Sequence, residues 1–155
     1  MYIHLINMNR PSLPTLPCMC ASFRRSSRAL TQHYDKALRP LGLRATQFTV
    51  LQALSLVGEV SQGELGEILA MDSTTLTRTL EIMGRHGWIA KHPGKDRREW
   101  RLSLTNFGES QFKRALPSWQ AVQSRLRGQL GGDRWEKLLS LTNVVTSAVT
   151  ELGDL

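Results

Sequence analysis

The chain has 155 residues, is 41% hydrophobic, and carries 20 Lys and Arg against 13 Asp and Glu, a formal net charge of +7. Length and composition indicate one globular domain, and they argue against a membrane protein because no apolar run approaches roughly 18 residues. The charge is unevenly distributed along the chain. Residues 85–101 hold six Lys or Arg and two Asp or Glu, whereas residues 51–84 hold one Lys or Arg and five Asp or Glu. Such a basic segment favours a polyanionic partner, although basic charge alone also fits a membrane surface.

Residues 1–17 predict an extended tail, because three prolines prevent a continuous helix there. The segment lacks the basic start and the apolar run of a signal peptide, and Met8 and Met19 are alternative translation starts. Cys18 and Cys20 are too few for a disulfide framework. We therefore expect a cytoplasmic protein.

The first two helices are predicted from apolar spacing and from the residues at their ends. One helix covers residues 19–38 and ends at Arg39 and Pro40, since the residue before a proline disfavours helical geometry. A second helix begins at Thr46, whose hydroxyl is a typical N-cap, and ends before Gly58. Both helices precede the most informative part of the chain.

Two shorter helices follow, separated by a tight turn. Ser61 and Glu64 form the pattern of a capping box, in which each side chain accepts a hydrogen bond from the backbone of the other residue. The next helix begins at Asp72 or Ser73 and ends at Gly87. Its apolar residues recur at steps of four and three and predict one buried face, made of Leu76, Leu80 and Met83. This pair of helices is typical of a helix-turn-helix.

Residues 88–105 predict a strand, a basic tip that contains Gly94, and a second strand. A hairpin directly after a helix-turn-helix predicts a winged helix-turn-helix. In that fold the second helix enters a DNA major groove, and the hairpin, or wing, reaches the neighbouring minor groove. The predicted fold is therefore mainly α with a small β-hairpin wing, and the predicted partner is double-stranded DNA.

Two longer helices complete the chain. Thr105 is predicted to cap a helix that reaches about Gly128 and is kinked at Pro117, because proline removes a backbone hydrogen bond and clashes with the preceding turn. After two glycines, Asp133 starts a last helix that is apolar on more than one face. A chain of this length has little else to cover that helix, so we predict a homodimer built from the terminal helices.

The predicted organisation is one domain behind a tail. The tail covers residues 1–17 and the domain residues 18–155. Within the domain, the winged helix-turn-helix occupies about 41–105, and the dimerisation helices occupy about 18–38 and 105–152. We find no internal repeat and no low-complexity block.

Three segments resemble, in order and spacing, the MarR (multiple antibiotic resistance regulator) family. They are LGLRATQFTVLQAL (41–54), MDSTTLTRTLEIMGRHGWI (71–89) and GKDRREWRLSLTNFG (94–108). The resemblance covers about residues 18–152 and implies a homodimer with one winged lobe per subunit on a pseudo-palindromic operator. It also implies transcriptional repression that a small ligand or an oxidant relieves.

Candidate DNA contacts lie on the second helix of the pair and on the wing. The N-terminal residues of a recognition helix reach base edges, and the resemblance assigns Arg98 to the minor groove with Asp96 as its orienting carboxylate. The candidate set is Ser73, Thr74, Thr75, Thr77, Arg78, Lys95, Asp96, Arg97 and Arg98. Ordinary helix surface and solvated hairpin charges are the alternative explanations. Because Ser and Thr discriminate bases weakly, we expect DNA shape to supply part of the specificity.

The resemblance also implies an effector pocket between the dimer helices and the winged lobe. The candidate walls are Phe23, Ser27, Phe48 and Trp119, and the candidate anion anchors are Arg24, Arg28 and His33. Such a lining favours a lipophilic aromatic acid as the small-molecule effector. Packing of the two arginines against carboxylates or against the dimer partner is the alternative.

Cys20 indicates a second mode of control. A subset of the family senses organic hydroperoxides with a cysteine near the start of the first helix, hydrogen-bonded in the dimer to tyrosine hydroxyls. Tyr34 follows Cys20 by 14 residues, similar to that subset, but Arg24 stands where the subset has an aromatic hydroxyl. Arg24 and the helix N-terminus would favour the thiolate. A small packed residue without a redox role is the alternative.

The sequence offers no candidate for catalysis. It has no Gly-rich phosphate loop, no nucleophile elbow and no paired carboxylates on one helix face, and Cys18, Cys20 and His33 match no common zinc spacing. We therefore expect a non-enzyme without a cofactor or metal. The predicted function is DNA-binding regulation, released by a ligand or by oxidation of Cys20. The alternative outside this class is a winged-helix module that binds another protein.

Overall fold

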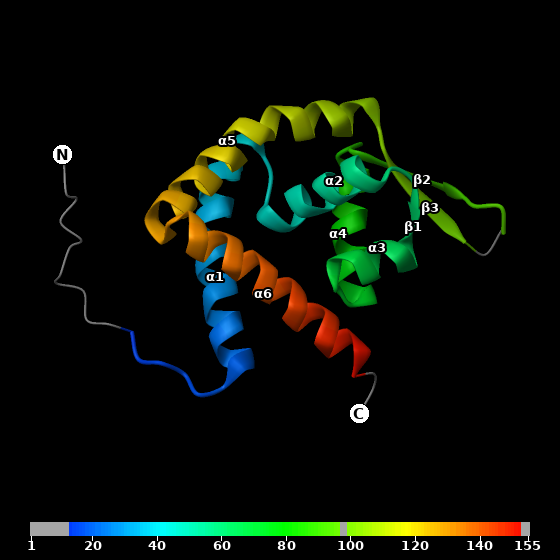
Figure 1. The fold of residues 1–155 in the computed structure, drawn as a ribbon. Helices are drawn as coiled ribbons and strands as arrows, with labels where there is room; N and C mark the ends of the chain where they lie inside the picture. Colours follow the sequence, from blue (N-terminus) through cyan, green and yellow to red (C-terminus); the bar gives the residue numbers. More distant parts are fainter. Residues whose placement is uncertain (1–12, 97–98, 153–155) are drawn as a thin grey trace.

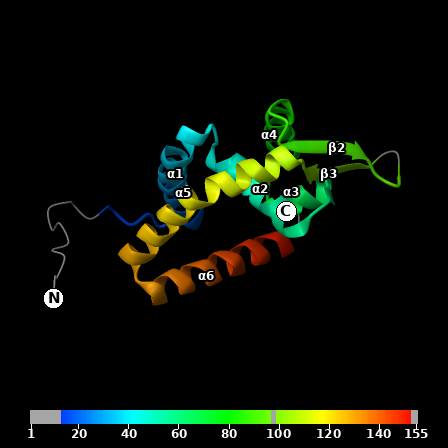
Figure 2. The same cartoon turned by 90° about the horizontal axis from the view of Figure 1, so that it is seen from above.

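The helices divide into two groups that meet along the longest of them (Figures 1 and 2). The computed structural model of the protein describes residues 13–96 and 99–152. The first group contains α1 (Met19–Leu38), α5 (Asn106–Leu130) and α6 (Gly132–Glu151). The second contains α2 (Ala45–Val57), α3 (Gln62–Leu69) and α4 (Ser73–Arg85), with the strands β1 (Val60–Ser61), β2 (Ile89–Pro93) and β3 (Trp100–Leu104). A short 3₁₀ helix, η1 (Arg39–Leu41), joins α1 to the second group. The predicted mainly α fold with a wing is confirmed.

The core lies where α2 packs against α3, α4, α5 and β3. Its fully buried side chains include Leu51, Leu65, Leu76, Met83 and Leu102. The predicted inner face of α4 is therefore correct, since Leu76 and Met83 are at most 1% exposed and Leu80 is 7% exposed. This burial fixes which face of α4 remains in solvent.

The start of α2 differs from the prediction. The helix begins at Ala45, not at Thr46, and its N-cap is Arg44. The Ala45 N–H donates to Asp35 Oδ1 of α1 at 2.7 Å, and the Arg44 N–H donates to Gln47 Oε1 at 2.9 Å. A carboxylate from another helix therefore satisfies the backbone donor that a local cap would have satisfied.

Local caps define the starts of α3 and α4 as predicted. Ser61 and Glu64 form the capping box, with hydrogen bonds of 3.1 Å to Ser61 Oγ and 2.7 Å to Glu64 Oε2. Asp72 caps α4 by accepting from the Thr75 N–H at 2.9 Å and from the Thr75 hydroxyl at 2.6 Å. These hydrogen bonds favour the ionised carboxylates. Thr75 thus lowers the pKa of Asp72, and Ser61 lowers the pKa of Glu64.

Acidification is expected to remove the stabilisation that Asp72 gives to α4. Because the pKa of Asp72 is lowered in the folded protein, this stabilisation is fully present above the unfolded-state pKa of about 3.9. It is lost as the pH falls through the lower folded-state value. Thermal unfolding of wild type and Asp72→Asn at about pH 7 and about pH 3 measures the effect. The difference in Tm should be larger at neutral pH, and a difference that widens in acid would contradict the prediction.

The end of α4, the wing and the start of α5 are joined at one point. The Thr105 hydroxyl donates to the Gly87 carbonyl at 2.6 Å and accepts from the Gly108 N–H at 2.9 Å. The Thr105 N–H donates to the Trp88 carbonyl at 3.1 Å. Thr105 is therefore the predicted cap of α5, and it also holds that helix to the segment between α4 and β2.

The sheet has three antiparallel strands in the order β1-β3-β2. The predicted hairpin pairs Ile89 with Leu104 and Pro93 with Trp100. The strand β1, in which Val60 pairs with Leu102, was not predicted from the sequence. A strand of two residues carries no alternating pattern, so only its pairing with β3 identifies it.

The last helix leaves most of its apolar side chains in solvent. The helix α5 continues through Pro117 to Leu130, and after Gly131 the chain folds back into α6 (Figure 1). No residue of α6 is buried, and its exposed apolar side chains are Leu138, Leu139, Leu141, Val144 and Val149. An apolar surface of this kind is typical of an interaction face.

Within the described ranges, no helix combines the length and the apolar character that crossing a membrane requires. Among the same residues, no group of three or more His, Cys, Asp or Glu is placed to hold a metal ion.

Candidate nucleic-acid interface

The solvent face of α4 carries the five predicted contact residues of that helix. Ser73, Thr74, Thr75, Thr77 and Arg78 are all exposed. With about 100° between successive residues, Thr74 and Arg78 point away from the buried Leu76, and Thr75 and Thr77 lie on either side of them. The first turn and a half of α4 therefore presents hydroxyls and one guanidinium to solvent.

The hydroxyls of α4 differ in their hydrogen bonds. The Thr75 hydroxyl donates to Asp72 within the N-cap. The Thr79 hydroxyl donates to the Thr75 carbonyl at 2.9 Å, inside the helix. The Thr77 hydroxyl instead accepts from Gln62 Nε2 of α3 at 2.9 Å. The hydroxyls of Thr75, Thr77 and Thr79 thus each have a protein partner.

Gln62 connects three elements, and the sequence analysis missed it. Its amide nitrogen donates to Thr77 of α4, and its amide oxygen accepts from Lys91 Nζ of β2 at 3.5 Å. The same ammonium lies 5.1 Å from the centre of the Trp100 ring on β3. A lone glutamine after an N-cap gives no signal in the sequence, because its partners are 15 and 29 residues away.

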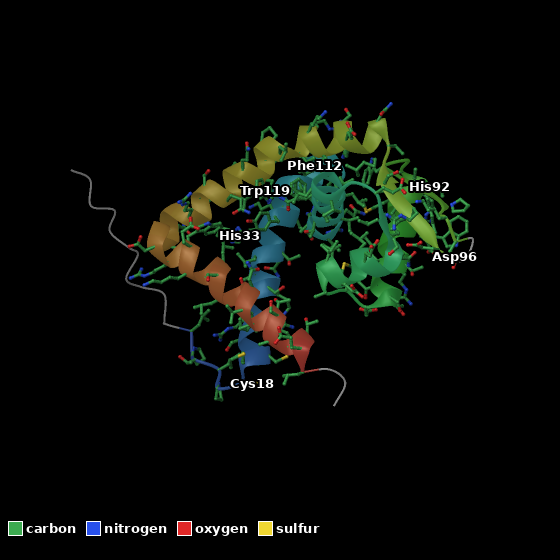
Figure 3. The ribbon with its side chains drawn as sticks, turned by 45° about the vertical axis from the view of Figure 1, so that its right-hand side comes forward. Cys18, His33, His92, Asp96, Phe112 and Trp119 are labelled. Atoms are coloured by element: carbon green, nitrogen blue, oxygen red, sulfur yellow. The ribbon has the colours of Figure 1, made fainter. Side chains whose placement is uncertain are left out.

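The wing extends away from the helices, beyond β1 (Figure 1). Its tip begins with a hydrogen bond from the Gly94 N–H to the Glu99 carbonyl at 2.7 Å. Lys95 and Asp96 are exposed, and Figure 3 shows Asp96 at the far end of the wing. The candidates Arg97 and Arg98 lie outside the described residues.

Arg101 of β3 fixes the base of the wing. Its guanidinium lies 3.1 Å from Glu99 Oε1, 3.2 Å from Glu64 Oε2 and 3.3 Å from Glu59 Oε1. It also donates to the Glu59 carbonyl at 3.0 Å. Hydrogen bonding to Glu99 is the main cause that raises the pKa of Arg101. One side chain therefore links β3, the start of α3 and the loop before β1, and the sequence analysis did not single it out.

A cavity of about 500 Å³ lies between α1, α2, α5 and α6. It brings together four predicted effector residues: Phe23, Ser27, Phe48 and Trp119. The Phe48 and Trp119 rings stack at a centroid distance of 5.8 Å, and Figure 3 shows Trp119 and Phe112 beneath α5.

The predicted anion anchors lie elsewhere. Arg24 and Arg28 line a separate shallow groove with Phe23 and Ser27, and His33 is an exposed residue of α1 that lines neither space. Their position on the helix is the reason: Arg24 and Arg28 lie on the side of α1 next to the cavity, and Phe23 and Ser27 border both spaces. Among the described residues, the polar lining of the cavity is uncharged, and it includes Tyr34, whose pKa burial raises.

The two predicted redox residues do not meet within one chain. Cys20 is exposed near the start of α1, and Tyr34 lies partly buried near its end. Fourteen residues of helix separate them by about 21 Å. The neighbouring Cys18 is also exposed, and Figure 3 shows it at the end of α1 far from the wing.

Comparison with known sequences identifies relatives of the winged region. The model of the MarR family matches residues 41–99. YwoH of Bacillus subtilis, an uncharacterised HTH-type transcriptional regulator, is 30% identical over 89 residues, 57% of this chain and 65% of that protein. The multiple antibiotic resistance protein MarR of Salmonella typhimurium is 38% identical over 72 residues, 46% of this chain and 50% of that protein. The chain thus spans half to about two thirds of these curated relatives.

Solved structures extend the similarity to nearly the whole chain. The M. tuberculosis transcriptional regulator MosR, solved with DNA, is 35% identical with a TM-score of 0.80, over 88% of this chain and 99% of that one. A mutant MarR from E. coli, solved with operator DNA, is 24% identical with a TM-score of 0.74, over 81% of this chain and 91% of that one. At that identity the second structure supports the fold alone. These relatives are transcriptional regulators, in agreement with the expected absence of enzyme activity. The chain belongs to the MarR family.

Proposed function

We propose that this protein is a dimeric, sequence-specific DNA-binding transcriptional repressor. The observation that carries the proposal is the exposed hydroxyl and guanidinium face of α4, which Gln62 and Lys91 connect to a basic wing. A helix of this kind fits a major groove while a wing reaches the adjacent minor groove. The proteins most similar in structure include one solved with DNA at 35% identity.

Within this proposal the contact residues divide by role. Ser73, Thr74, Thr75, Thr77 and Arg78 face base edges and nearby phosphates in the major groove. Lys95 neutralises a phosphate, and Arg98 enters the minor groove with Arg97 and Asp96 beside it. Phosphate contacts give affinity that depends on salt, and base contacts give sequence preference.

Arg98→Ala is expected to weaken operator binding by about 1–3 kcal/mol without unfolding the protein, because it removes a charge from a narrow groove. Lys95→Ala should weaken binding to DNA of every sequence alike and reduce the salt dependence of binding by about one counterion. Fluorescence anisotropy with a labelled operator, selected from random duplexes and titrated at several salt concentrations, measures both.

The matched control is Lys113→Ala, which removes one exposed positive charge from α5, a helix that carries none of the proposed DNA contacts. It should change operator affinity little. Unchanged binding in Arg98→Ala would contradict the role of the wing. Binding that is insensitive to salt and to sequence would instead favour the protein-interaction module.

The cavity supports control by a small aromatic effector. Phe23, Phe48 and Trp119 offer ring contacts, and Arg24 and Arg28 lie on the adjoining face of α1 for an acidic group. A ligand releases DNA only if it binds better to the arrangement of lobes that misses consecutive major grooves. Titration of the operator complex with aromatic acids tests this proposal, and loss of hydroperoxide-driven release in Cys20→Ser would establish the thiol alternative.

A further inference from the structure

The orientation of the Gln62 side chain determines how Thr77 can bond to a partner. A lysine ammonium only donates hydrogen bonds, so the amide oxygen of Gln62 faces Lys91 and its NH₂ group faces Thr77. An amide nitrogen also only donates. Thr77 Oγ1 must therefore accept this bond, at 2.9 Å.

A threonine hydroxyl has one proton and two lone pairs. Gln62 takes one lone pair of Thr77, so the proton and the second lone pair are left for the solvent side. Several other helical threonines give their proton to their own helix, as Thr79 does to the Thr75 carbonyl and Thr146 to the Thr142 carbonyl. Over the ranges 13–96 and 99–152, no acceptor is found for the Thr77 hydroxyl. Since Thr77 is exposed, this proton is available to a ligand on the surface of α4.

The Thr75 hydroxyl has its hydrogen bond in the opposite direction, as a donor. Its hydroxyl proton is given to Asp72 Oδ2 at 2.6 Å, so only its lone pairs remain for a ligand. The surface of α4 therefore presents one hydroxyl that can still donate, at Thr77, and one that can only accept, at Thr75, two residues apart. Both assignments follow from partners within the protein, Gln62 and Asp72.

We infer that Gln62 contributes to base specificity by keeping the proton of Thr77 free, so that Thr77 donates to an acceptor atom of DNA. This inference rests on the proposed DNA-binding function. Gln62 is a positioning residue, because it acts through Thr77. In the major groove, guanine and thymine offer acceptors at O6, N7 and O4, whereas cytosine offers a donor at N4. Thr77 is thus expected to favour an acceptor atom over cytosine N4 at one position in each half-site, because its second lone pair can accept from N4 but its proton is then left unpaired.

The decisive variant is Gln62→Glu. The new carboxylate has only acceptors, so it takes bonds from both Lys91 and the Thr77 hydroxyl, and Thr77 then presents lone pairs to DNA. The added negative charge lowers affinity for every duplex, so the measured quantity is the ratio of affinities between operators that differ at one base pair. We expect the preference against cytosine to disappear or reverse, a change of about fivefold for one hydrogen bond.

Three further variants complete the series. Gln62→Leu removes the donor and leaves the Thr77 hydroxyl free to act either way, so discrimination should weaken without reversing. Thr77→Val should abolish discrimination at the same base pair. Thr79→Val is the matched control, because the hydroxyl it removes bonds only within the helix. Circular dichroism melting establishes that each variant is folded before its binding is compared.

Two arms separate a base contact from a phosphate contact. Removing the acceptor on the base with a 7-deazapurine or a base exchange should affect wild type but not Thr77→Val. If the acceptor is instead on the DNA backbone, a methylphosphonate at the nearest phosphate should weaken binding by wild type but not by Thr77→Val. An affinity ratio that is unchanged in Gln62→Glu would overturn the inference. Absence of any sequence-dependent binding by wild type would instead remove the proposed function itself.

Discussion

Replacing Gly108 with alanine is expected to lower the free energy of unfolding by about 3 kcal/mol. A Cβ atom at this position would overlap the carbonyl oxygen and carbon of Trp88. That carbonyl also accepts the Thr105 N–H at 3.1 Å, so both backbone segments are held in place. Because the clash is with backbone rather than with the end of a flexible side chain, α5 and the wing would have to separate.

Gly128→Ala supplies the control on the same helix. Nothing lies within 4 Å of a Cβ atom at Gly128, and alanine there should stabilise α5 by up to about 1 kcal/mol. Urea unfolding followed by circular dichroism measures both variants. Equal stability of Gly108→Ala and wild type would mean that the start of α5 does not approach Trp88 this closely in solution.

Leu141→Glu is expected to convert the protein into monomers and to reduce operator affinity by at least about a hundredfold. Leu141 is 60% exposed on α6, in the middle of the apolar surface that we assign to the dimer. In a dimer with two-fold symmetry, each interface would bury two unpaired carboxylates. The recognition helices would then no longer be held about 34–36 Å apart, the spacing of consecutive major grooves.

Sedimentation velocity at micromolar concentration and operator titration measure the two effects of Leu141→Glu. Leu56→Glu is the matched control, since Leu56 is 80% exposed but lies on α2. It should leave the association state unchanged. A wild-type monomer that binds the operator with full affinity would contradict the dimer.

Features that depend on neighbours in the chain could be predicted from the sequence. The caps Ser61, Asp72 and Thr105 each bond to backbone three residues away, so their positions follow from local chemistry. The apolar face of α4 is likewise a local pattern. For the same reason the exposed hydroxyls of α4 were correctly placed in solvent, although their contact with DNA stays a prediction.

Features that depend on distant partners could not be predicted in this way. Asp35 replaces Thr46 at the start of α2 because the turn through η1 brings α1 beside it. Gln62 and Arg101 gain their roles only when α3, α4 and the wing are in place. The cavity was predicted by residue type, and the geometry of α1 places Phe23 and Ser27 in its wall but Arg24 and His33 outside it.

The attachment of α5 at Thr105 has a mechanical consequence. The helix carries Trp119 in the wall of the cavity, and its first turn is bonded to Gly87 and Trp88 at the junction of α4 and the wing. We expect a shift of α5 to move α4 and the wing together, because these bonds join the three elements. If an operator favours one position of α5, thermodynamic reciprocity requires that it change the affinity of the cavity for a ligand by the same factor as the ligand changes the affinity for the operator.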